Sequence, residues 1–167
     1  TAMYGFALKK ADETPEMILK LSNLLDYLLY KVDKPFVLLK DDINHIKDYI
    51  ELEKMRFNDT MKIEFVTNTI SENLKIAPML LIPFVENSFK HGAIKSNQLT
   101  INMRLHCEDQ FIHFYIENSN TKTKAVTKGI GLENIKKRLD LLYKNDYTLK
   151  IENEDDFFKV DLKLNLN

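Results

Sequence analysis

One stretch of strict apolar–polar alternation near the middle of the chain limits its fold more than any other feature. From Leu99 to Cys107 every second residue is apolar, and the residues between them are polar. The alternation resumes from Ile112 to Ile116 after the polar connection at residues 108–110. A period of two places one face of a strand against a core and the other toward solvent. The stretch therefore predicts an antiparallel hairpin in a sheet that is covered on one face.

Helices on either side of the hairpin are expected to supply the covering layer. Apolar side chains at helical spacing predict helices over residues 14–31, 41–57, 78–91 and about 132–144. Shorter apolar or alternating runs predict further strands over residues 36–39, 62–66, 147–152 and 157–166. In the 78–91 helix, Pro78 would occupy the first turn and Gly92 the position past the last residue. The sequence therefore predicts a two-layer α/β sandwich.

The helix expected at residues 14–31 is apolar around more than one face. Ile18, Leu21, Leu25 and Leu28 follow the spacing of a single face. Further apolar side chains widen that face: Leu24, Tyr27, Leu29 and Tyr30. A helix this apolar needs cover on more than one side, which leaves two interpretations open. Either it is buried against its own domain, or it pairs with another chain.

Composition and charge exclude several classes of function. With 44% hydrophobic and 29% charged residues among 167, the chain has enough apolar surface to bury a core. Its 24 basic and 25 acidic residues leave a net charge of −1, which gives no electrostatic argument for a nucleic-acid partner. The single cysteine, Cys107, allows no internal disulfide and suits a reducing compartment such as the cytosol. The histidines show no zinc-ligand spacing, and no apolar run is long enough to span a membrane.

The helix at residues 78–91 gathers polar side chains of the kind that bind a cation and phosphate. At about 100° per residue, Asn87, Lys90 and His91 fall on one side, away from the apolar residues. The carboxamide oxygen of Asn87 suits a hard cation, and the charge of Lys90 suits phosphate. An ordinary solvated face is the alternative interpretation. Glu86 either acts as a base through a water molecule or is simply exposed.

A second candidate phosphate site lies at the junction between a polar loop and the last predicted helix. Gly129 and Gly131 allow the backbone to approach a phosphate closely, and a helix amino terminus attracts the anion. Residues 120–138 carry six basic side chains against Glu133, a net charge of 6 − 1 = +5. This charge suits a polyphosphate, although a solvated loop and helix face would also account for it. Neither a GxxxxGKS/T nor a GxGxxG motif is present.

Four motifs, in order along nearly the whole chain, resemble those of one family. Residues 21–30 (LSNLLDYLLY) are similar to LSxLLRYxLY, and residues 49–57 (YIELEKMRF) to YLxIExxRF. Residues 81–92 (LIPFVENSFKHG) resemble an N box that usually reads LQPLVENAIKHG. Residues 129–143 (GIGLENIKKRLDLLY) resemble the second glycine box, GIGLxNxxxRLxLLY. The chain thus resembles sensor histidine kinases of the LytS/YehU type.

The resemblance implies a fold, a reaction and a set of site residues. The fold would be the Bergerat sandwich of the GHKL ATPases in residues 35–167, preceded by a helical remnant of the dimerisation region in residues 1–34. The family binds ATP and Mg²⁺ and transfers the γ-phosphoryl group to a histidine, then to an aspartate of a response regulator. The implied catalytic residues are Glu86 and Asn87, and Asn87 would also bind Mg²⁺. The implied nucleotide contacts are Asn87, Lys90, His91, Asn118, Gly129, Gly131 and Leu132, with Ser119 to Lys128 as the ATP lid.

The first glycine box of the family, DxGxG, is altered in this chain. Asn118 stands where the family has the aspartate that accepts a hydrogen bond from the adenine amino group, and Asn120 and Lys122 replace glycines. The side-chain oxygen of Asn118 can still accept this bond, but without charge, so we expect weaker ATP binding. The altered box supports a rival hypothesis, a pseudokinase scaffold that links a membrane receptor to its regulator. The retained N box and second glycine box argue against the scaffold.

The family's acceptor histidine lies in a PHFLFN-like motif, and no such motif occurs in this chain. We therefore expect no autophosphorylation by this chain alone. The resemblance also implies a homodimer in the full-length protein and a response regulator of the LytTR type. It implies the cytoplasmic domain of an inner-membrane sensor, with membrane contact only through upstream segments. A related ATPase of the gyrase or chaperone type is a third hypothesis, but its members share only the short boxes.

Overall fold

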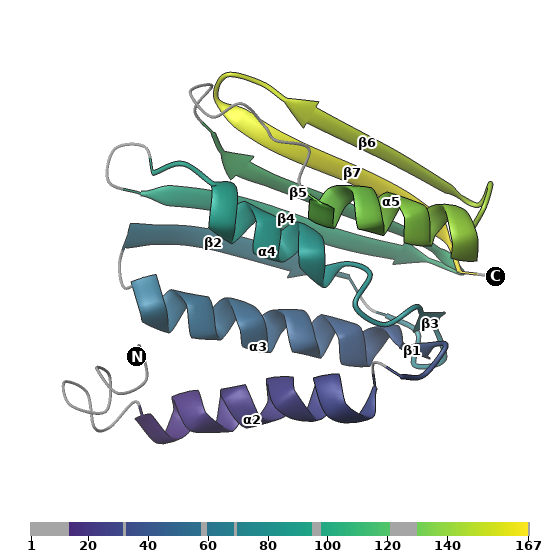
Figure 1. The fold of residues 1–167 in the computed structure, drawn as a ribbon, viewed down its shortest axis with the longest axis horizontal. Helices are drawn as coiled ribbons and strands as arrows, with labels where there is room; N and C mark the ends of the chain where they lie inside the picture. The colour runs from purple at the N-terminus through teal and green to yellow at the C-terminus, as the bar shows by residue number, and fades with distance from the viewer. Residues whose placement is uncertain are drawn as a thin grey trace.

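Figure 1 shows the computed structural model, which describes residues 14–31, 33–57, 60–68, 70–94, 98–120 and 130–166. The helices in these ranges are α2 (Thr14–Tyr30), α3 (Leu39–Phe57), α4 (Ile82–His91) and α5 (Ile130–Leu142). The strands are β1 (Val37–Leu38), β2 (Met61–Thr67), β3 (Lys75–Ile76), β4 (Leu99–Glu108), β5 (Phe111–Ser119), β6 (Tyr147–Asn153) and β7 (Phe157–Asn165). Each predicted helix and strand has a counterpart here, and β3 is an addition that the sequence analysis did not predict.

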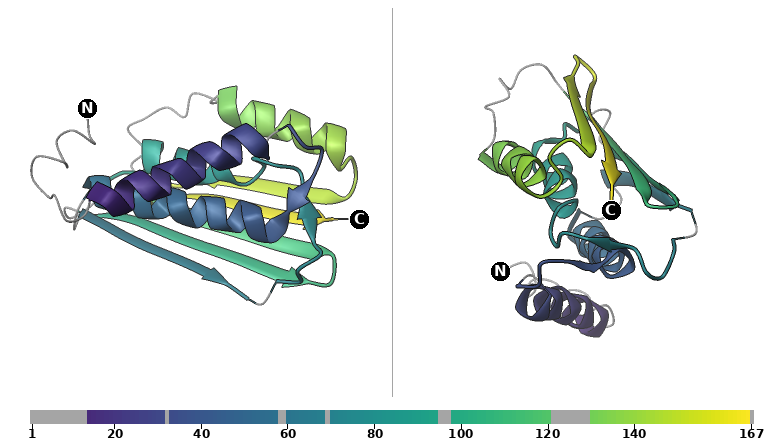
Figure 2. Two further views of the ribbon diagram at one scale, coloured as in Figure 1. Left: turned by 90° about the horizontal axis from the view of Figure 1, so that it is seen from below. Right: turned by 90° about the vertical axis from the view of Figure 1, so that its right-hand side faces the viewer.

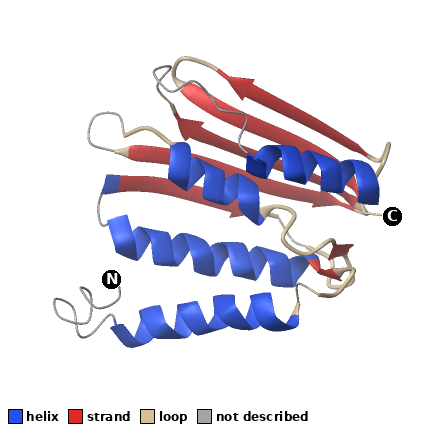
Figure 3. Ribbon diagram, viewed as in Figure 1, coloured by secondary structure: helices blue, strands red, loops and turns tan. Residues whose placement is uncertain are grey.

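Five strands form one sheet in the order β2-β4-β5-β7-β6. β2 runs parallel to β4, and the other neighbouring pairs are antiparallel, so that β4–β5 and β6–β7 are hairpins. β1 and β3 pair separately as a small antiparallel ribbon. Helices α3, α4 and α5 lie on one face of the larger sheet, and α2 lies on the side of α3 away from it (Figure 2, and by type of element in Figure 3). This arrangement confirms the predicted two-layer α/β sandwich.

The core lies between the sheet and the three helices that cover it. Buried side chains alternate along three adjacent strands: Leu99, Ile101, Met103, Leu105, Ile112, Phe114, Ile116, Val160, Leu162 and Leu164. The register places Met103 opposite Ile116 and Phe114 opposite Leu162, so these side chains form continuous rows across the sheet. From the helix layer, the ring of Phe84 packs against Phe114 with 6.3 Å between centroids. The hairpin that this alternation predicted is confirmed.

Helix α4 starts later than predicted, at Ile82 rather than at Pro78. Pro83, and not Pro78, lies in its first turn. The preceding segment does not continue the helix because Met79 has a φ of 58°, in the left-handed region. Arg138 of α5 holds this segment by donating hydrogen bonds to the carbonyl oxygens of Pro78 (2.8 Å) and Met79 (3.1 Å). A contact from so far along the chain leaves no trace in local residue spacing.

Helix α2 packs on α3 with a different face from the one predicted. The expected face is largely exposed, at 55% for Ile18 and 49% for Leu25, whereas Met17 and Tyr27 are buried. A buried tyrosine hydroxyl needs a hydrogen-bond partner, and Asp42 of α3 provides one. The helix is thus covered on one side by its own domain, and its pairing with a second chain stays a prediction. No helix in the described ranges, α2 included, is long and apolar enough to span a membrane.

Phe114 and Phe111 lie on the same strand and allow a test of the core. The side chain of Phe114 is fully buried, while that of Phe111 is 60% exposed. We expect Phe114→Ala to lower the free energy of unfolding by about 3–5 kcal/mol, because it leaves a cavity beside Phe84. The matched change Phe111→Ala should cost less than about 1 kcal/mol. Urea denaturation of both variants measures the difference, and equal losses would contradict the assigned core.

Candidate functional site

The carboxyl end of α4 is tied to the last residues of β5. The backbone N–H of Ala93 donates to the carbonyl oxygen of Ser119 (2.7 Å). In return, the hydroxyl of Ser119 donates to the carbonyl oxygen of Ala93 (2.6 Å). The Ser119 carbonyl also accepts a hydrogen bond from the side-chain Nδ2 of Asn118 (3.0 Å). These contacts bring the predicted phosphate-binding helix and the altered first glycine box into one site.

The side chain of Asn118 lies on the inner face of the sheet and is buried, with 2% of its surface exposed. Its Nδ2 is held by Ser119, which fixes the orientation of the carboxamide. Its Oδ1 has no hydrogen-bond partner in the described part of the chain. A buried acceptor left without a donor costs about 1–3 kcal/mol, so such groups are rare in stable folds. The side chain of Asn118 therefore keeps an acceptor that no donor among the described residues satisfies.

Gly92 ends α4 at a point of close packing. An added Cβ would lie 2.4 Å from Cδ1 of Leu99 and 2.5 Å from the carbonyl oxygen of Ser88. It would also lie 3.4 Å from Nδ2 of Asn118. The backbone φ of −58° is available to any residue, so the short distances, and not the conformation, require the glycine. Helical spacing predicts Gly92 just past the helix end, but no motif marks it as a residue of the site.

The predicted polar side of α4 faces away from the core. The side chains of Glu86, Lys90 and His91 are exposed and that of Asn87 is half-buried, while the apolar side of the helix is buried. Partial burial and the nearby carboxylate of Glu53 raise the pKa of Glu86, against the opposing charge of Lys90. The helix therefore presents a carboxamide, two basic side chains and a carboxylate of raised proton affinity.

Helix α3 contributes a second carboxylate that the sequence analysis did not single out. Glu53 is buried, and Arg56 contacts it at 2.8 Å. Burial raises the pKa of Glu53, and the charge of Arg56 opposes that shift. The ring of Tyr49 packs edge-on against Phe89 of α4, with 5.5 Å between centroids. Residues 49–57 form one of the family motifs, so a signal was present, but spacing alone does not say which helix these residues face.

Helices α4 and α5 lie beside one another over the sheet and run in opposite directions (Figure 1). Gly131 lies exposed in the first turn of α5, with no atom within 4 Å of an added Cβ. Leu132 is half-buried against the core and anchors this end of the helix. Gly129 and residues 121–128 of the expected lid lie outside the described residues.

The basic segment around the start of α5 is only partly available to an anion. Its predicted charge of +5 includes Arg138, whose guanidinium donates instead to the carbonyl oxygens of Pro78 and Met79. Lys136 and Lys137 are exposed on α5. The remaining lysines of the segment lie outside the described residues: Lys122, Lys124 and Lys128.

Within the described ranges, no group of three or more His, Cys, Asp or Glu side chains could hold a metal ion. The predicted metal ligand, Asn87, offers a single carboxamide oxygen. Mg²⁺ usually keeps several water molecules and binds through few side chains together with substrate phosphates. The donors on α4 therefore fit a Mg²⁺ ion that arrives with a nucleotide better than one held by protein side chains alone.

Comparisons with known proteins find similarity to histidine kinases. The model described as "Histidine kinase" matches residues 1–61. The sensor histidine kinase BtsS of Escherichia coli (strain K12) is 28% identical over 155 residues, which cover 86% of this chain and 27% of that protein. Both matches agree in pointing to sensor histidine kinases as the proteins that this chain resembles. The resemblance found in the motifs is confirmed, and the chain spans less than a third of the length of this relative.

Solved structures of histidine kinases share the fold. The catalytic domain of ThkA matches with a TM-score of 0.58 at 15% identity, over 78% of this chain and 95% of that one. ThkA in complex with the response regulator TrrA matches with a TM-score of 0.54 at 12% identity, over 99% of this chain and 57% of that one. The domain boundary between residues 34 and 35 and the roles of the site residues stay predictions.

Gly131 and Gly92 form a matched pair for glycine-to-alanine changes. At Gly131 the added methyl group meets open space in a helix, so Gly131→Ala should raise the free energy of unfolding by about 0.5–1 kcal/mol. If the backbone there approaches a phosphate, the same variant should bind ATP more weakly. Gly92→Ala should lower stability, because the methyl group meets Leu99 and the Ser88 backbone. Thermal unfolding and nucleotide titration measure both effects, and normal ATP binding by Gly131→Ala would contradict the phosphate role.

Proposed function

We propose that this chain is the ATP-binding portion of a two-component sensor kinase. It would bind ATP with Mg²⁺ and place the γ-phosphoryl group for transfer to a histidine outside the chain, and from there to an aspartate of a response regulator. The observation that carries the proposal is Oδ1 of Asn118, a buried acceptor without a partner among the described residues, where α4 meets β5. An adenine amino group is a donor of the kind that this oxygen lacks.

Each part of the nucleotide has a candidate partner in this arrangement. Asn118 would accept the hydrogen bond from adenine, and Asn87 would bind Mg²⁺, which neutralises charge on the phosphates. The phosphate contacts would come from the end of α4 and the start of α5: Lys90, His91, Gly129 and Gly131. Leu132 would hold the start of α5 against the core. In phosphoryl transfer the protein mainly positions groups and stabilises charge, so this set suits the reaction.

Glu86 is the candidate for proton transfer during the reaction. A histidine phosphorylated on one ring nitrogen loses a proton to become neutral, and a carboxylate reached through water can take it. A base works best when its pKa lies near the working pH. Partial burial and the neighbouring Glu53 shift the pKa of Glu86 upward, in that direction. The residue would therefore act beside Asn87 on the same turn of α4.

The full-length protein would work with partners outside this chain. We propose a homodimer, a response regulator of the LytTR type and a place at the inner membrane through segments that this chain lacks. The exposed apolar side chains of α2, among them Ile18 and Leu25, support pairing of that helix with a second copy.

A pseudokinase scaffold is the alternative, and one contact favours it. Asn120 stands where the family has a glycine, and its Nδ2 donates to Oδ1 of Asn153 (2.6 Å) and to the carbonyl oxygen of Glu154 (3.2 Å). These bonds tie the start of the expected lid to the β6–β7 turn, a constraint that a glycine would not impose. A lid held at its start suits a chain that binds nucleotide weakly or not at all.

Isothermal titration with a non-hydrolysable ATP analogue, with and without Mg²⁺, separates the two functions. The kinase proposal expects a Kd between micromolar and sub-millimolar, about −8 to −5 kcal/mol, that depends on Mg²⁺. Asn87→Ala should weaken Mg²⁺-dependent binding by about tenfold or more, because a metal ligand is lost. Asn102→Ala, on the outer face of β4, is the matched control and should bind like wild type. No binding at millimolar nucleotide by a folded protein would favour the scaffold.

Replacement of Asn118 by leucine separates a ligand role from a structural one. Asn118→Leu should weaken binding of the ATP analogue by about tenfold, because the adenine amino group loses its acceptor. The free energy of unfolding should stay equal or rise, because a buried carbonyl oxygen without a partner is removed. Asn118→Asp keeps an acceptor and should bind at least as tightly as wild type. Unchanged nucleotide affinity in Asn118→Leu would contradict the adenine role.

A further inference from the structure

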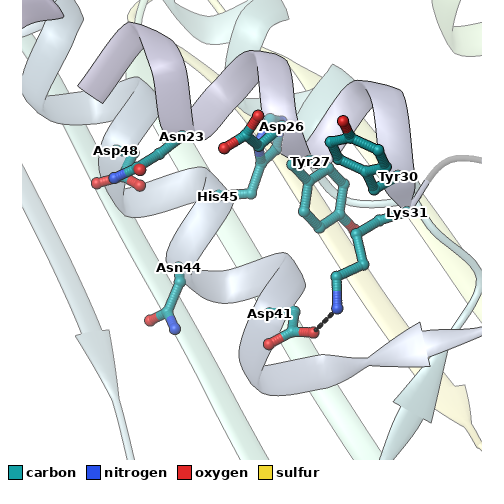
Figure 4. A pocket seen from close by; sticks show the side chains of 9 residues that line it. All are labelled: Asn23, Asp26, Tyr27, Tyr30, Lys31, Asp41, Asn44, His45 and Asp48. Atoms are coloured by element: carbon teal, nitrogen blue, oxygen red, sulfur yellow. Dashed lines mark hydrogen bonds and ion pairs between the residues drawn. The ribbon is translucent and has the colours of Figure 1, made fainter. Parts of the chain in front are cut away.

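The interface between α2 and α3 has a polar end that lies close to the start of α4. The hydroxyl of Tyr27 donates to Oδ1 of Asp42 (2.5 Å), and its ring stacks on His45 with 4.2 Å between centroids. Beside them, Lys31 and Asp41 form an ion pair at 2.9 Å. Figure 4 shows Tyr27, His45 and the Lys31–Asp41 pair gathered where the two helices meet. This end of α2 is therefore held by specific polar contacts as well as by apolar packing.

Burial of the Asp42 carboxyl group in this interface carries a desolvation cost. Its side chain is fully buried, and its Oδ2 has no hydrogen-bond partner in the described part of the chain. Oδ1 accepts both the Tyr27 hydroxyl and the backbone N–H of Met79 (3.3 Å). Burial raises the pKa of Asp42, against the hydrogen bonds from Tyr27 and Met79 and the charge of Arg138. Apolar residues at such positions usually give equal or greater stability, so stability alone does not explain the pair.

The segment that Asp42 contacts is strained and is held from its other side by α5. Met79 adopts a left-handed backbone conformation that is unfavourable for a residue with a side chain. Arg138 donates to the carbonyl oxygens of Pro78 and Met79, and the hydroxyl of Tyr143 accepts from the backbone N–H of Ala77 (2.9 Å). Residues 77–79 thus lie between Asp42 on one side and α5 on the other, and they lead into α4.

Both helices that this segment joins carry predicted nucleotide contacts. The chain passes from Met79 into α4, which carries Asn87. Arg138 lies two turns of α5 after Gly131, and a helix transmits a shift along its axis as a nearly rigid body. A change in the seating of α2, that is, in how α2 packs on α3, would therefore shift both groups of predicted phosphate contacts through residues 77–79.

We propose that Tyr27 and Asp42 are positioning residues that couple the seating of α2 on α3 to nucleotide binding at α4 and α5. The inference rests on the proposed function, because it needs a nucleotide at that site. When α2 is packed on α3, Asp42 holds the backbone N–H of Met79. The contacts of Arg138 with Pro78 and Met79 then fix the position of α4 relative to α5. Coupling of this kind is reciprocal, so nucleotide binding must favour the seated α2 by the same factor.

Hydrogen exchange of the α2 amides, with and without the ATP analogue and Mg²⁺, tests the coupling directly. In the wild-type chain, nucleotide should slow exchange in α2 by about fivefold or more, although α2 carries no predicted nucleotide contact. In Tyr27→Phe, which removes only a hydroxyl, this nucleotide-dependent protection should be lost. The Kd for the analogue in Tyr27→Phe should rise by the factor by which protection falls.

Two control variants separate coupling from simple loss of packing. Tyr30→Phe removes an exposed hydroxyl on the same helix and should change neither quantity. Lys31→Gln breaks the ion pair with Asp41 at the same interface, so it should speed α2 exchange and leave the nucleotide effect intact. A role limited to stability would make Tyr27→Phe behave like Lys31→Gln, with normal nucleotide affinity.

The outcomes distinguish the two proposals. If the folded wild-type chain does not bind the analogue, the proposed function fails and this inference fails with it. If it binds but α2 exchange is the same with and without nucleotide, the coupling is wrong and the proposed function stands. Protection that persists in Tyr27→Phe would also overturn the role of the Tyr27–Asp42 hydrogen bond.

Discussion

Burial of one face of the five-stranded sheet holds the rest of the structure in place. The period of two that turns Ile112, Phe114 and Ile116 toward the helices also turns Asn118 toward them, because Asn118 occupies the next inward position of β5. A slip of one residue in strand pairing would move all four side chains to the opposite face. The polar group of the site is therefore buried by the register that builds the core, and Ser119 holds α4 beside it.

The parts of the fold that the sequence predicted are those in which neighbouring residues carry the whole signal. The β4–β5 hairpin and β7 follow from alternation, since each inward side chain has its partner in the adjacent strand. The outward side of α4, with Asn87 and Lys90, follows from helical spacing in the same way. Residues of the site that lie within one motif could thus be placed on a common side from the sequence alone.

The rest depended on contacts between distant segments, which spacing does not report. On α2 the apolar surface extends beyond one face, and the face that packs on α3 carries Met17 and Tyr27, whose hydroxyl is bonded to Asp42. The segment before α4 is held by Arg138, which counts as a phosphate-binding charge in the sequence but binds backbone carbonyls in the fold. Similarly, the approach of Glu53 to Glu86 required knowing that α3 packs beside α4. The function of a predicted charge can be assigned only after its competing partners are known.

Three unfavourable features of this domain lie at the two ends of one helix. At the amino end of α4 lie the left-handed Met79 and the buried Asp42, and at its carboxyl end lies the unpartnered Oδ1 of Asn118. A fold shaped for stability alone would remove each of them by a single substitution. A donor that satisfies Asn118 would stabilise the arrangement in which α4 is fixed at both ends, and that arrangement includes the strained segment at Met79. Occupancy at one end and seating of α2 at the other therefore act on the same conformational equilibrium, which is the physical condition for each to influence the other.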